Sequence, residues 1–385
     1  MEYSRILDVE KLLSQKSFFL FGPRSTGKSF LIRKQLSGKS VIINLLDGDT
    51  YLRYSAEPSL LTKTAEMGRK EGKIVVVDEI QRVPALLDQV HLAIEEQQAK
   101  FLLTGSSARK LKRRGVNLLA GRAWEARMFP LVWSEIPDFD LEQYLRYGGL
   151  PQVYPSPNPR EELSAYTNTY LKEEIAEEGV LRNMPQFARF LKVAALCSGE
   201  LINYSAIASD CAVAASTVRE YFSILEHTLI GFTVEPWIES KKRKAIQTAK
   251  FYLFDTGVTH ALSGTEHLDR NSDLFGKSFE QWIAMELRAY LSYRRVQADL
   301  CFWRSVNGQE VDFVIGNKCA IEVKSTKRVG TKDLRGLFAL AEEQSHKTLI
   351  CVSHDPAFRQ EGIVLCMPWQ LFVKRLWNDE IVRYT

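Results

Sequence analysis

The sequence predicts an α/β protein that begins with a parallel sheet and continues into further domains. Short apolar runs alternate with helical patterns over residues 1 to about 135, which is typical of a parallel sheet flanked by helices. A glycine-rich loop joins the first apolar run to the first helical pattern. The length of 385 residues exceeds one ordinary hydrophobic core, so two or three domains are expected.

The composition excludes several classes of protein. Hydrophobic residues make up 45% and charged residues 25% of the chain, as in soluble globular proteins. No apolar run is long enough to span a membrane, and the first residues lack the apolar segment of a secretory signal. The six cysteines have no C-x-x-C spacing, which argues against a disulfide framework or a zinc site. We therefore expect a cytoplasmic protein without a membrane partner.

The glycine-rich loop has the sequence GPRSTGKS, a complete match to the P-loop pattern G-x-x-x-x-G-K-[ST]. Such a loop curls its backbone N–H groups around phosphate, and the following helix adds a favourable dipole. Lys28 would reach the β- and γ-phosphates, and the Ser29 hydroxyl would contact Mg²⁺. The sequence thus predicts ATP and Mg²⁺ as cofactors, held by Gly22, Pro23, Arg24, Ser25, Thr26, Gly27, Lys28 and Ser29.

A second motif completes a site for nucleotide hydrolysis. The apolar run 74–77 ends in Asp78 and Glu79, and further strands are expected at 17–21, 41–45 and 101–104. Asp78 would hold Mg²⁺ through water, while Glu79 would orient or deprotonate the attacking water. A kinase has no need of a water-activating residue at this point, so Glu79 favours hydrolysis over phosphoryl transfer to another substrate.

Two further positions are candidates for contact with the γ-phosphate. The strand 101–104 leads into a Gly-Ser turn, where Thr104 or Ser106 could sense the phosphate, although a plain turn explains the residues equally well. Arg122 could supply positive charge in cis, or as an arginine finger to a neighbouring subunit's nucleotide. The alternative for Arg122 is an ordinary surface arginine.

The middle of the chain predicts a helix-turn-helix followed by a hairpin. Prolines at 137 and in 151–159 mark the end of the first domain, and a polar helical pattern covers 161–178. A helix is expected at 204–211, and a capping box at Thr217 and Glu220 would open a second helix that ends at Gly231. Strands at 232–238 and 251–254 flank the basic run 241–244, which gives a winged-helix pattern.

A winged helix of this kind could bind DNA or serve only as a packing module. In a DNA complex the start of the second helix would enter the major groove and the basic run would contact phosphates. The residues concerned are Ser216, Thr217, Arg219, Lys241, Lys242, Arg243 and Lys244. Charge runs are more often solvated surface, so the pattern permits a DNA partner without requiring one.

Taken together, these motifs resemble a large, mostly uncharacterised family of prokaryotic AAA-type ATPases. The resemblance rests on GPRSTGKS, VVVDEIQRVPALL, FLLTGSSARKL, LAGRAWEARMFPLVWSEI, YGGLPQVY and KFYLFDTGV. It implies an ATPase core over 1–136, a linker over 137–185, a winged helix over 186–264 and a nuclease-like domain over 265–385. It also favours Arg122 as a functional residue, and because AAA-type relatives often form rings, a homo-oligomer and a monomer both stay open.

The C-terminal part resembles the PD-(D/E)xK nuclease superfamily, which has an α/β fold like that of restriction endonucleases. A helix over 275–300 precedes strands at 302–304, 310–315 and 319–324, then a helix at 334–341 and a strand at 348–352. By this resemblance Asp312 matches the first acidic position, Glu322 and Lys324 match E-x-K, and Glu280 matches the helix carboxylate.

Alternation along the strands indicates the chemistry that these residues could perform. It sets Asp312 on one face of its strand, and Glu322 with Lys324 on one face of theirs. Converging carboxylates would bind Mg²⁺ or Mn²⁺, which could activate water against a phosphodiester while Lys324 stabilises negative charge. Glu310 lies close enough to complicate the choice of ligands. Alternating polar residues also fit any half-exposed strand, so the nuclease activity stays one of two interpretations.

The sequence therefore predicts an ATPase that couples its nucleotide state to DNA binding or metal-dependent DNA cleavage. The alternative is a nucleotide-dependent regulatory module whose nuclease-like domain is catalytically inactive.

Overall fold

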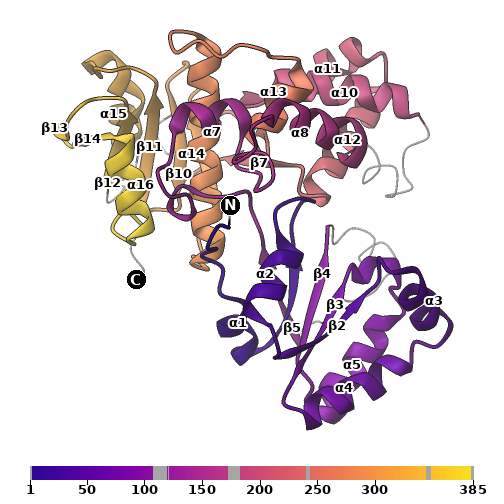
Figure 1. Ribbon diagram of the computed structural model, residues 1–385. Coiled ribbons are helices and arrows are strands. Elements are labelled where there is room, and N and C mark those ends of the chain that lie inside the picture. Colours follow the sequence, from indigo (N-terminus) through magenta and orange to yellow (C-terminus); the bar gives the residue numbers. More distant parts are fainter. Residues whose placement is uncertain are drawn as a thin grey trace. The chain divides into compact units, whose positions relative to one another are not determined.

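The computed structural model describes residues 2–106, 119, 121–171, 183–239, 243–343 and 348–382 (Figure 1). These residues form two compact units. The first contains residues up to Phe129 and the short segment His227–Ile230, and the second contains most of the remaining chain. Lys241 and Lys242 of the predicted basic run 241–244 lie outside the described residues.

The first unit is a parallel five-stranded sheet with helices between its strands. The strand order is β2-β3-β4-β1-β5, and every neighbouring pair is parallel. Its elements are α1 (Val9–Gln15), β1 (Ser17–Phe21), α2 (Lys28–Gln35), β2 (Ser40–Asn44), α3 (Gly48–Ala56), α4 (Leu60–Lys70), β3 (Ile74–Asp78), η1 (Ile80–Arg82), α5 (Leu86–Gln97), β4 (Phe101–Gly105) and β5 (Ala123–Arg127).

The four predicted strands of this unit are confirmed to within about a residue at each end. All five residues of β1 and of β4 are buried, because helices cover both faces of a parallel sheet. Their side chains join those of β3 and α5 in one hydrophobic core. β5 was not predicted, since its residues AWEAR are mostly exposed on the outermost strand and show no apolar run.

The second unit is built on a mixed sheet. The order β13-β14-β12-β11-β10-β9-β7-β8-β6 contains parallel and antiparallel pairs. Its elements are η2 (Trp133–Glu135), α7 (Leu141–Tyr147), α8 (Pro159–Ala165), a π-helix (Tyr166–Tyr170), α10 (Met184–Leu196), β6 (Glu200–Leu201), α11 (Tyr204–Cys211), α12 (Ala215–His227), β7 (Gly231–Pro236), β8 (Lys250–Leu253), α13 (Thr256–Ser263), α14 (Asp273–Tyr293), β9 (Leu300–Arg304), β10 (Glu310–Ile315), β11 (Cys319–Lys324), η4 (Thr331–Leu334), α15 (Arg335–Ala341), β12 (Thr348–Ser353), β13 (Arg359–Glu361), β14 (Val364–Pro368) and α16 (Trp369–Trp377).

The elements predicted for the second unit are present, with corrections at several ends. α12 begins at Ala215, so Thr217 and Glu220 lie inside the helix and the predicted capping box is wrong. The helix ends at His227 and Leu229 takes a left-handed backbone, while Gly231 is already the first residue of β7. α14 ends at Tyr293 rather than at 300, just before Arg295, which is also left-handed. The predicted helix 161–178 begins as α8 and a π-helix, and its residues beyond 171 are outside the described part.

The sheet joins strands from both sides of the predicted boundary at residue 264. β7 and β8 form the predicted antiparallel hairpin, and β7 also pairs in parallel with β9. The segment before β8 also joins this sheet. Ala245 forms a β-bridge with Ser305, and Ile246 N–H donates to the Arg304 carbonyl at 2.9 Å. The hairpin is thus part of the same sheet as the strands that carry Asp312 and Glu322.

The glycine-containing end of α7 packs against the glycine-containing start of α13. The Asp255 carboxylate accepts hydrogen bonds from Gly149 N–H at 2.8 Å and from Val258 N–H at 3.0 Å, which caps α13. A Cβ atom on Gly148 would lie 1.9 Å from Asp255 Oδ1, and one on Gly257 would lie 2.1 Å from the Tyr147 carbonyl oxygen. Gly148 and Gly257 are therefore required by the close packing of α7 on α13.

Candidate functional site

The P-loop follows β1 and adopts a tightly curled conformation. Ser25 and Gly27 both have left-handed backbones, with φ of 63° and 93°, and α2 begins at the next residue, Lys28. The Thr26 hydroxyl donates to the Pro23 carbonyl at 2.8 Å, which closes the loop on itself. Arg5 donates to the Thr26 carbonyl at 2.8 Å and to the Phe129 carbonyl at 2.7 Å, so it braces the loop from outside the motif.

Lys28 is buried against its own loop. Its Nζ donates to the carbonyl oxygens of Gly22 at 2.6 Å and Pro23 at 3.0 Å, and only 7% of the residue is exposed. Gly22 itself packs closely, because a Cβ atom there would lie 2.6 Å from the Met128 carbonyl oxygen. The loop thus presents its lysine at the start of a helix, the arrangement that phosphate binding uses.

The second motif meets the P-loop through a chain of polar contacts. Ser29 Oγ donates to Asp78 Oδ2 at 3.1 Å, and the Thr104 hydroxyl donates to the other oxygen, Oδ1. Glu79 N–H donates to Thr104 Oγ1 at 3.2 Å. The strand order explains why the two motifs meet. β4 lies between β1 and β3, and the carboxyl ends of parallel strands all lie at the same end of the sheet. A hydroxyl and a carboxylate in contact are a donor set that fits Mg²⁺.

Glu79 is held by a residue that sequence reasoning missed. Its backbone is left-handed, with φ of 61°, which is strained for a residue other than glycine. Gln81 Nε2 donates to Glu79 Oε2, and Gln81 is itself 7% exposed. A Cβ atom on Gly105 would lie 2.5 Å from Gln81 Oε1, so β4 leaves just enough space for this glutamine. No local pattern distinguished Gln81 from an ordinary polar residue in DEIQR.

The remaining candidates of the first unit separate clearly. Thr104 is fully buried and bonds to Asp78, whereas Ser106 is buried two residues further along. Arg122 lies at the end of the sheet where the strands begin, because the next residue, Ala123, pairs with Ser17, the first residue of β1. The P-loop lies at the other end of β1, about 16 Å away along the strand. Arg122 instead contacts Glu95, so the prediction that it acts on the nucleotide in cis disagrees with its position.

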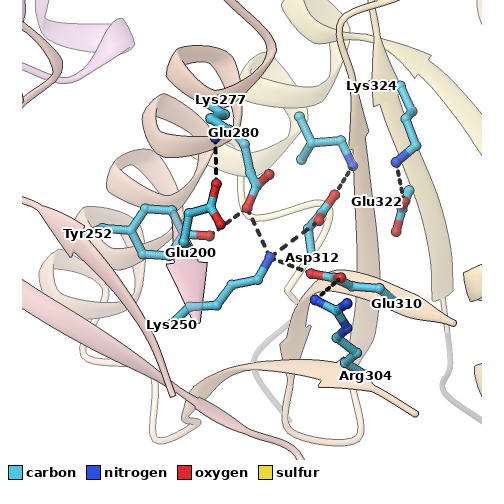
Figure 2. A network of polar contacts seen from close by, with 11 residues as sticks. Glu200, Lys250, Tyr252, Lys277, Glu280, Arg304, Glu310, Asp312, Glu322 and Lys324 are labelled. Atoms are coloured by element: carbon cyan, nitrogen blue, oxygen red, sulfur yellow. Dashed lines mark hydrogen bonds and ion pairs between the residues drawn. The ribbon is translucent and has the colours of Figure 1, made fainter. Parts of the chain in front are cut away.

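The acidic residues of the second unit gather around a lysine that was not predicted (Figure 2). Lys250 is the first residue of β8 and is 4% exposed. Its Nζ lies 2.6 Å from Glu310 Oε1, 3.2 Å from Glu280 Oε1 and 3.7 Å from Asp312 Oδ1. The Tyr252 hydroxyl also donates to Glu280 Oε1, at 2.6 Å. The structure thus brings Glu280, Glu310 and Asp312 together, with an ammonium group among them.

Asp312 and Glu322 are buried beside this group. Phe313 pairs with Ile321, so the same register sets Asp312 opposite Glu322. The β10–β9 pairing shifts by one residue between Val311 and Val314. Such a bulge re-aims side chains. Asp312 Oδ2 accepts from Val323 N–H at 2.8 Å, and Lys324 Nζ contacts Glu322 Oε1. Burial and the Glu280 charge raise the pKa of Asp312 to about 7, and burial and Asp312 raise the pKa of Glu322.

The predicted metal site of a nuclease does not fit this arrangement. Within the described ranges, no group of three His, Cys, Asp or Glu side chains is placed to hold a metal ion. Glu280 and Lys324 line a cavity of about 1280 Å³, but Asp312 and Lys250 are not among its lining residues. Glu322 Oε2 is buried and has no hydrogen-bond partner among the described residues, yet the neighbouring Glu310 and Asp312 already face Lys250.

Some of the predicted DNA-contact residues are exposed, whereas others already contact side chains of the second unit. At the start of α12, Ser216 and Arg219 are exposed and Thr217 is half-buried, while the Arg219 guanidinium lies 4.8 Å from the Tyr204 ring centroid. Arg243 donates to Glu342 at 2.7 Å and to Glu343 at 2.8 Å, so its charge is already compensated within the unit. Arg243 therefore offers less free positive charge than the sequence indicated.

Comparison with known sequence families divides the chain into three consecutive parts. Residues 14–137 match a family described as AAA domain. Residues 138–269 and 275–372 match two families described as domains of unknown function, DUF8612 and DUF4143. The first match supports a nucleotide-binding, ATPase-like N-terminal part, in agreement with the parallel sheet and the P-loop. Neither of the others identifies a winged helix or a nuclease.

Several relatives are similar to this chain over half or more of their length. An uncharacterized protein of Mycobacterium tuberculosis is 26% identical over 363 residues, which cover 91% of this chain and 79% of that protein. An uncharacterized protein of Methanocaldococcus jannaschii is 23% identical over 352 residues, covering 82% and 76%. One of Haemophilus influenzae is 24% identical over 207 residues, covering 49% and 52%. Their descriptions add no substrate or partner.

No helix among the described residues combines the length and the apolar character that crossing a membrane would require.

Proposed function

We propose that the first unit binds and hydrolyses ATP with the help of Mg²⁺. The observation that carries this proposal is the hydrogen-bonded chain from Ser29 through Asp78 to Thr104. It joins motif positions that are 49 and 26 residues apart in the sequence. The similarity of residues 14–137 to the AAA domain family gives independent support.

Each residue of this site has a distinct role in the proposal. Ser29 and Asp78 would hold Mg²⁺, which supplies positive charge to the β- and γ-phosphates. Lys28 would turn from its two carbonyl partners to the phosphates and neutralise their charge. Glu79 would orient and deprotonate the attacking water, with its carboxylate positioned by Gln81. Thr104 would hold the Asp78 carboxylate and the Glu79 backbone in position through its hydroxyl group.

The test compares Lys28→Ala and Glu79→Gln with controls on the same unit. We expect Lys28→Ala to lose ATP binding in equilibrium dialysis. Glu79→Gln should retain binding and lose hydrolysis by roughly 10²-fold or more, because only the proton acceptor is removed. Lys34→Ala and Glu71→Gln change exposed residues of the same type and should behave like wild type. Normal hydrolysis by Glu79→Gln would defeat the assignment of the base.

We propose secondly that nucleotide state controls partner binding by the second unit, with DNA as the partner and without DNA cleavage. Support for a binding role comes from the exposed Ser216 and Arg219 at the start of α12. Against cleavage stands the position of Lys250 among the carboxylates that a catalytic metal would need. Metal-dependent cleavage is therefore the weaker of the two interpretations of this unit.

Labelled duplex DNA distinguishes these alternatives. We expect binding that changes between ADP and a non-hydrolysable ATP analogue, and that weakens in Arg219→Ala but not in Lys192→Ala, which changes an exposed residue of α10. Incubation of supercoiled DNA with Mg²⁺ or Mn²⁺ should leave it intact. Nicking by the wild type that is lost in Asp312→Asn would restore the nuclease interpretation, and absence of DNA binding in every nucleotide state would exclude DNA as the partner.

A further inference from the structure

Lys250 is placed in the carboxylate cluster by several elements of the second unit. The segment before it runs beside the end of β9, and its ammonium group lies 5.5 Å from the Phe302 ring centroid on that strand. From there Nζ reaches Glu310 and Asp312 on β10 and Glu280 on α14. Figure 2 shows the ammonium group at the meeting point of these side chains.

The cluster needs a cation because Asp312, together with the neighbouring Glu322, is largely removed from water. Asp312 and Glu322 are 6% and 5% exposed, and uncompensated buried carboxylates are strongly destabilising. Arg304 contacts Glu310 at 3.3 Å and Lys324 contacts Glu322, which leaves Glu280 and Asp312 to Lys250. Burial alone would lower the pKa of Lys250, but the surrounding acids and Tyr252 raise it overall, so the group stays charged at neutral pH.

We propose that Lys250 is the resident cation of the cluster formed by Glu280, Glu310 and Asp312, and that it excludes a divalent ion from these carboxylates. An ammonium group donates three hydrogen bonds, and this one has an acid oxygen within 4 Å from each of the three residues. A metal ion bound to the same oxygens at about 2.3 Å would lie against the ammonium charge. This inference does not depend on ATP hydrolysis by the first unit.

Glu280, Glu310 and Asp312 are arranged around an ammonium group and not as metal ligands. The proposal predicts that, once the lysine charge is removed, these acids move together around a divalent cation and create a site for it. Lys250→Met keeps an unbranched apolar stem over Phe302 but leaves the carboxylates without their cation. Binding of Mn²⁺ to the full-length chain can be counted by electron paramagnetic resonance of the free ion. All variants would carry Asp78→Asn, so that the P-loop acid does not contribute. Lys277→Met is the matched control, because Lys277 is exposed on α14 and contacts only the surface residue Glu200 among the acids in Figure 2.

The expected result is one additional bound Mn²⁺ in Lys250→Met, absent from the wild type and from Lys277→Met, and lost again in Lys250→Met with Asp312→Asn. Two results would overturn the proposal. The first is Mn²⁺ binding by the otherwise wild-type chain that Asp312→Asn abolishes, because the lysine would then not exclude the metal. The second is a well-folded Lys250→Met chain that gains no Mn²⁺ site.

A stability measurement keeps the proposal testable if Lys250→Met folds poorly. We expect its melting temperature to fall by about 10 °C, as for loss of one partner of a buried ion pair, and Mn²⁺ to restore part of the loss. The same substitution should cost far less in a chain that already carries Glu280→Gln and Asp312→Asn, because the two acids that depend on Lys250 are then neutral. An equal loss in both backgrounds would show that Lys250 acts through packing alone.

Discussion

Glu79 adopts a left-handed backbone conformation that costs a residue other than glycine about 1–3 kcal/mol, so neighbouring residues must maintain it. Thr104 binds its N–H group and Gln81 binds its carboxylate. The strain and the two supports set the direction of the one side chain that the proposal uses as a base. The sequence indicated Glu79 and, as a possible phosphate sensor, Thr104, whereas Gln81 occupies an unremarkable polar position and was missed.

Substitution of Gln81 tests this support. We expect Gln81→Ala to lower the turnover number for ATP roughly tenfold while leaving the affinity for ATP unchanged, because the base loses its position but stays present. Gln89→Ala, on α5, provides a control that changes the same residue type away from the site. The check is steady-state ATPase kinetics together with nucleotide binding. A loss confined to ATP affinity would contradict a positioning role.

Arg122 gives a second test at the scale of single residues. Arg122 lies where the strands of the sheet begin, and the P-loop lies at the other end of the strands. Arg122→Ala should therefore leave ATP hydrolysis by a dilute monomer unchanged. Loss of its exposed contact with Glu95 should alter stability by less than about 1 kcal/mol. If Arg122 serves a neighbouring subunit, the variant instead loses the increase in activity with protein concentration. Inactivity at concentrations where light scattering shows only monomers would mean that the arginine does reach its own nucleotide.

Among the elements, α7 and α13 are joined more tightly than their sequences suggest. Gly148 has a φ of 76° and no space for a side chain, because Asp255 Oδ1 would lie 1.9 Å from a Cβ atom. The carboxylate that fills this space caps α13 and also binds Gly149 N–H. A short glycine pair on one helix end thus fixes the start of another helix that is distant in sequence.

We expect Gly148→Ala to destabilise the second unit by about 3 kcal/mol or more, because it combines backbone strain with a clash. Gly264→Ala is the matched control: Gly264 has a φ of 79° but nothing within 4 Å of a built Cβ atom. That variant should lose only about 1 kcal/mol, the backbone cost alone. Chemical denaturation followed by tryptophan fluorescence measures both. Equal losses in the two variants would show that the packing against Asp255 contributes nothing.

Elements that a run of neighbouring residues identifies were predicted well. Features that depend on contacts with residues distant in the sequence were not. The strands β1, β3 and β4 are continuous apolar runs, and the P-loop is a contiguous motif, so both could be read from neighbouring residues. β5 is held by pairing with β1, and Lys250 is defined by acids at least 30 residues away. Such features depend on tertiary contacts, which carry no signature in the residues beside them.

For the molecule as a whole, the two units have separate cores and should respond separately to ligand. ATP at 100 times its dissociation constant should stabilise the unit that binds it by about 2.7 kcal/mol. We therefore expect ATP with Mg²⁺ to raise one of two transitions in differential scanning calorimetry. Lys28→Ala should remove that shift and leave the other transition in place. A shift of both transitions together would show that the units unfold as one.

Acidity should affect the stability of the second unit. Glu286 is buried and accepts hydrogen bonds from Trp133, Trp282 and Trp377, but burial dominates and raises its pKa to about 7. Burial likewise raises the pKa of Asp255 to about 6. Both groups bind a proton more tightly when folded, so their stabilising contribution is present at low pH and is lost as pH rises from about 4 to 7.

The measurement is the free energy of unfolding of the second unit between pH 5 and 8. Wild type should lose stability through this range, and Glu286→Gln should show a smaller slope because it removes one titrating group near Glu135. Asp312 titrates in the same window, so the comparison is between variants rather than with a flat baseline. Glu380→Gln, at an exposed carboxylate, is the control. An unchanged slope in Glu286→Gln would contradict this assignment.

The parallel pairing of β7 with β9 has a consequence for how the chain can be divided. A fragment that begins at residue 265 would carry β9 without β7, and so would present a bare strand edge to solvent. It would also lack Lys250, leaving the buried acids of β10 without their nearest cation. Exposed strand edges recruit other chains, so such a fragment should aggregate, whereas one that begins at residue 130 keeps the sheet complete.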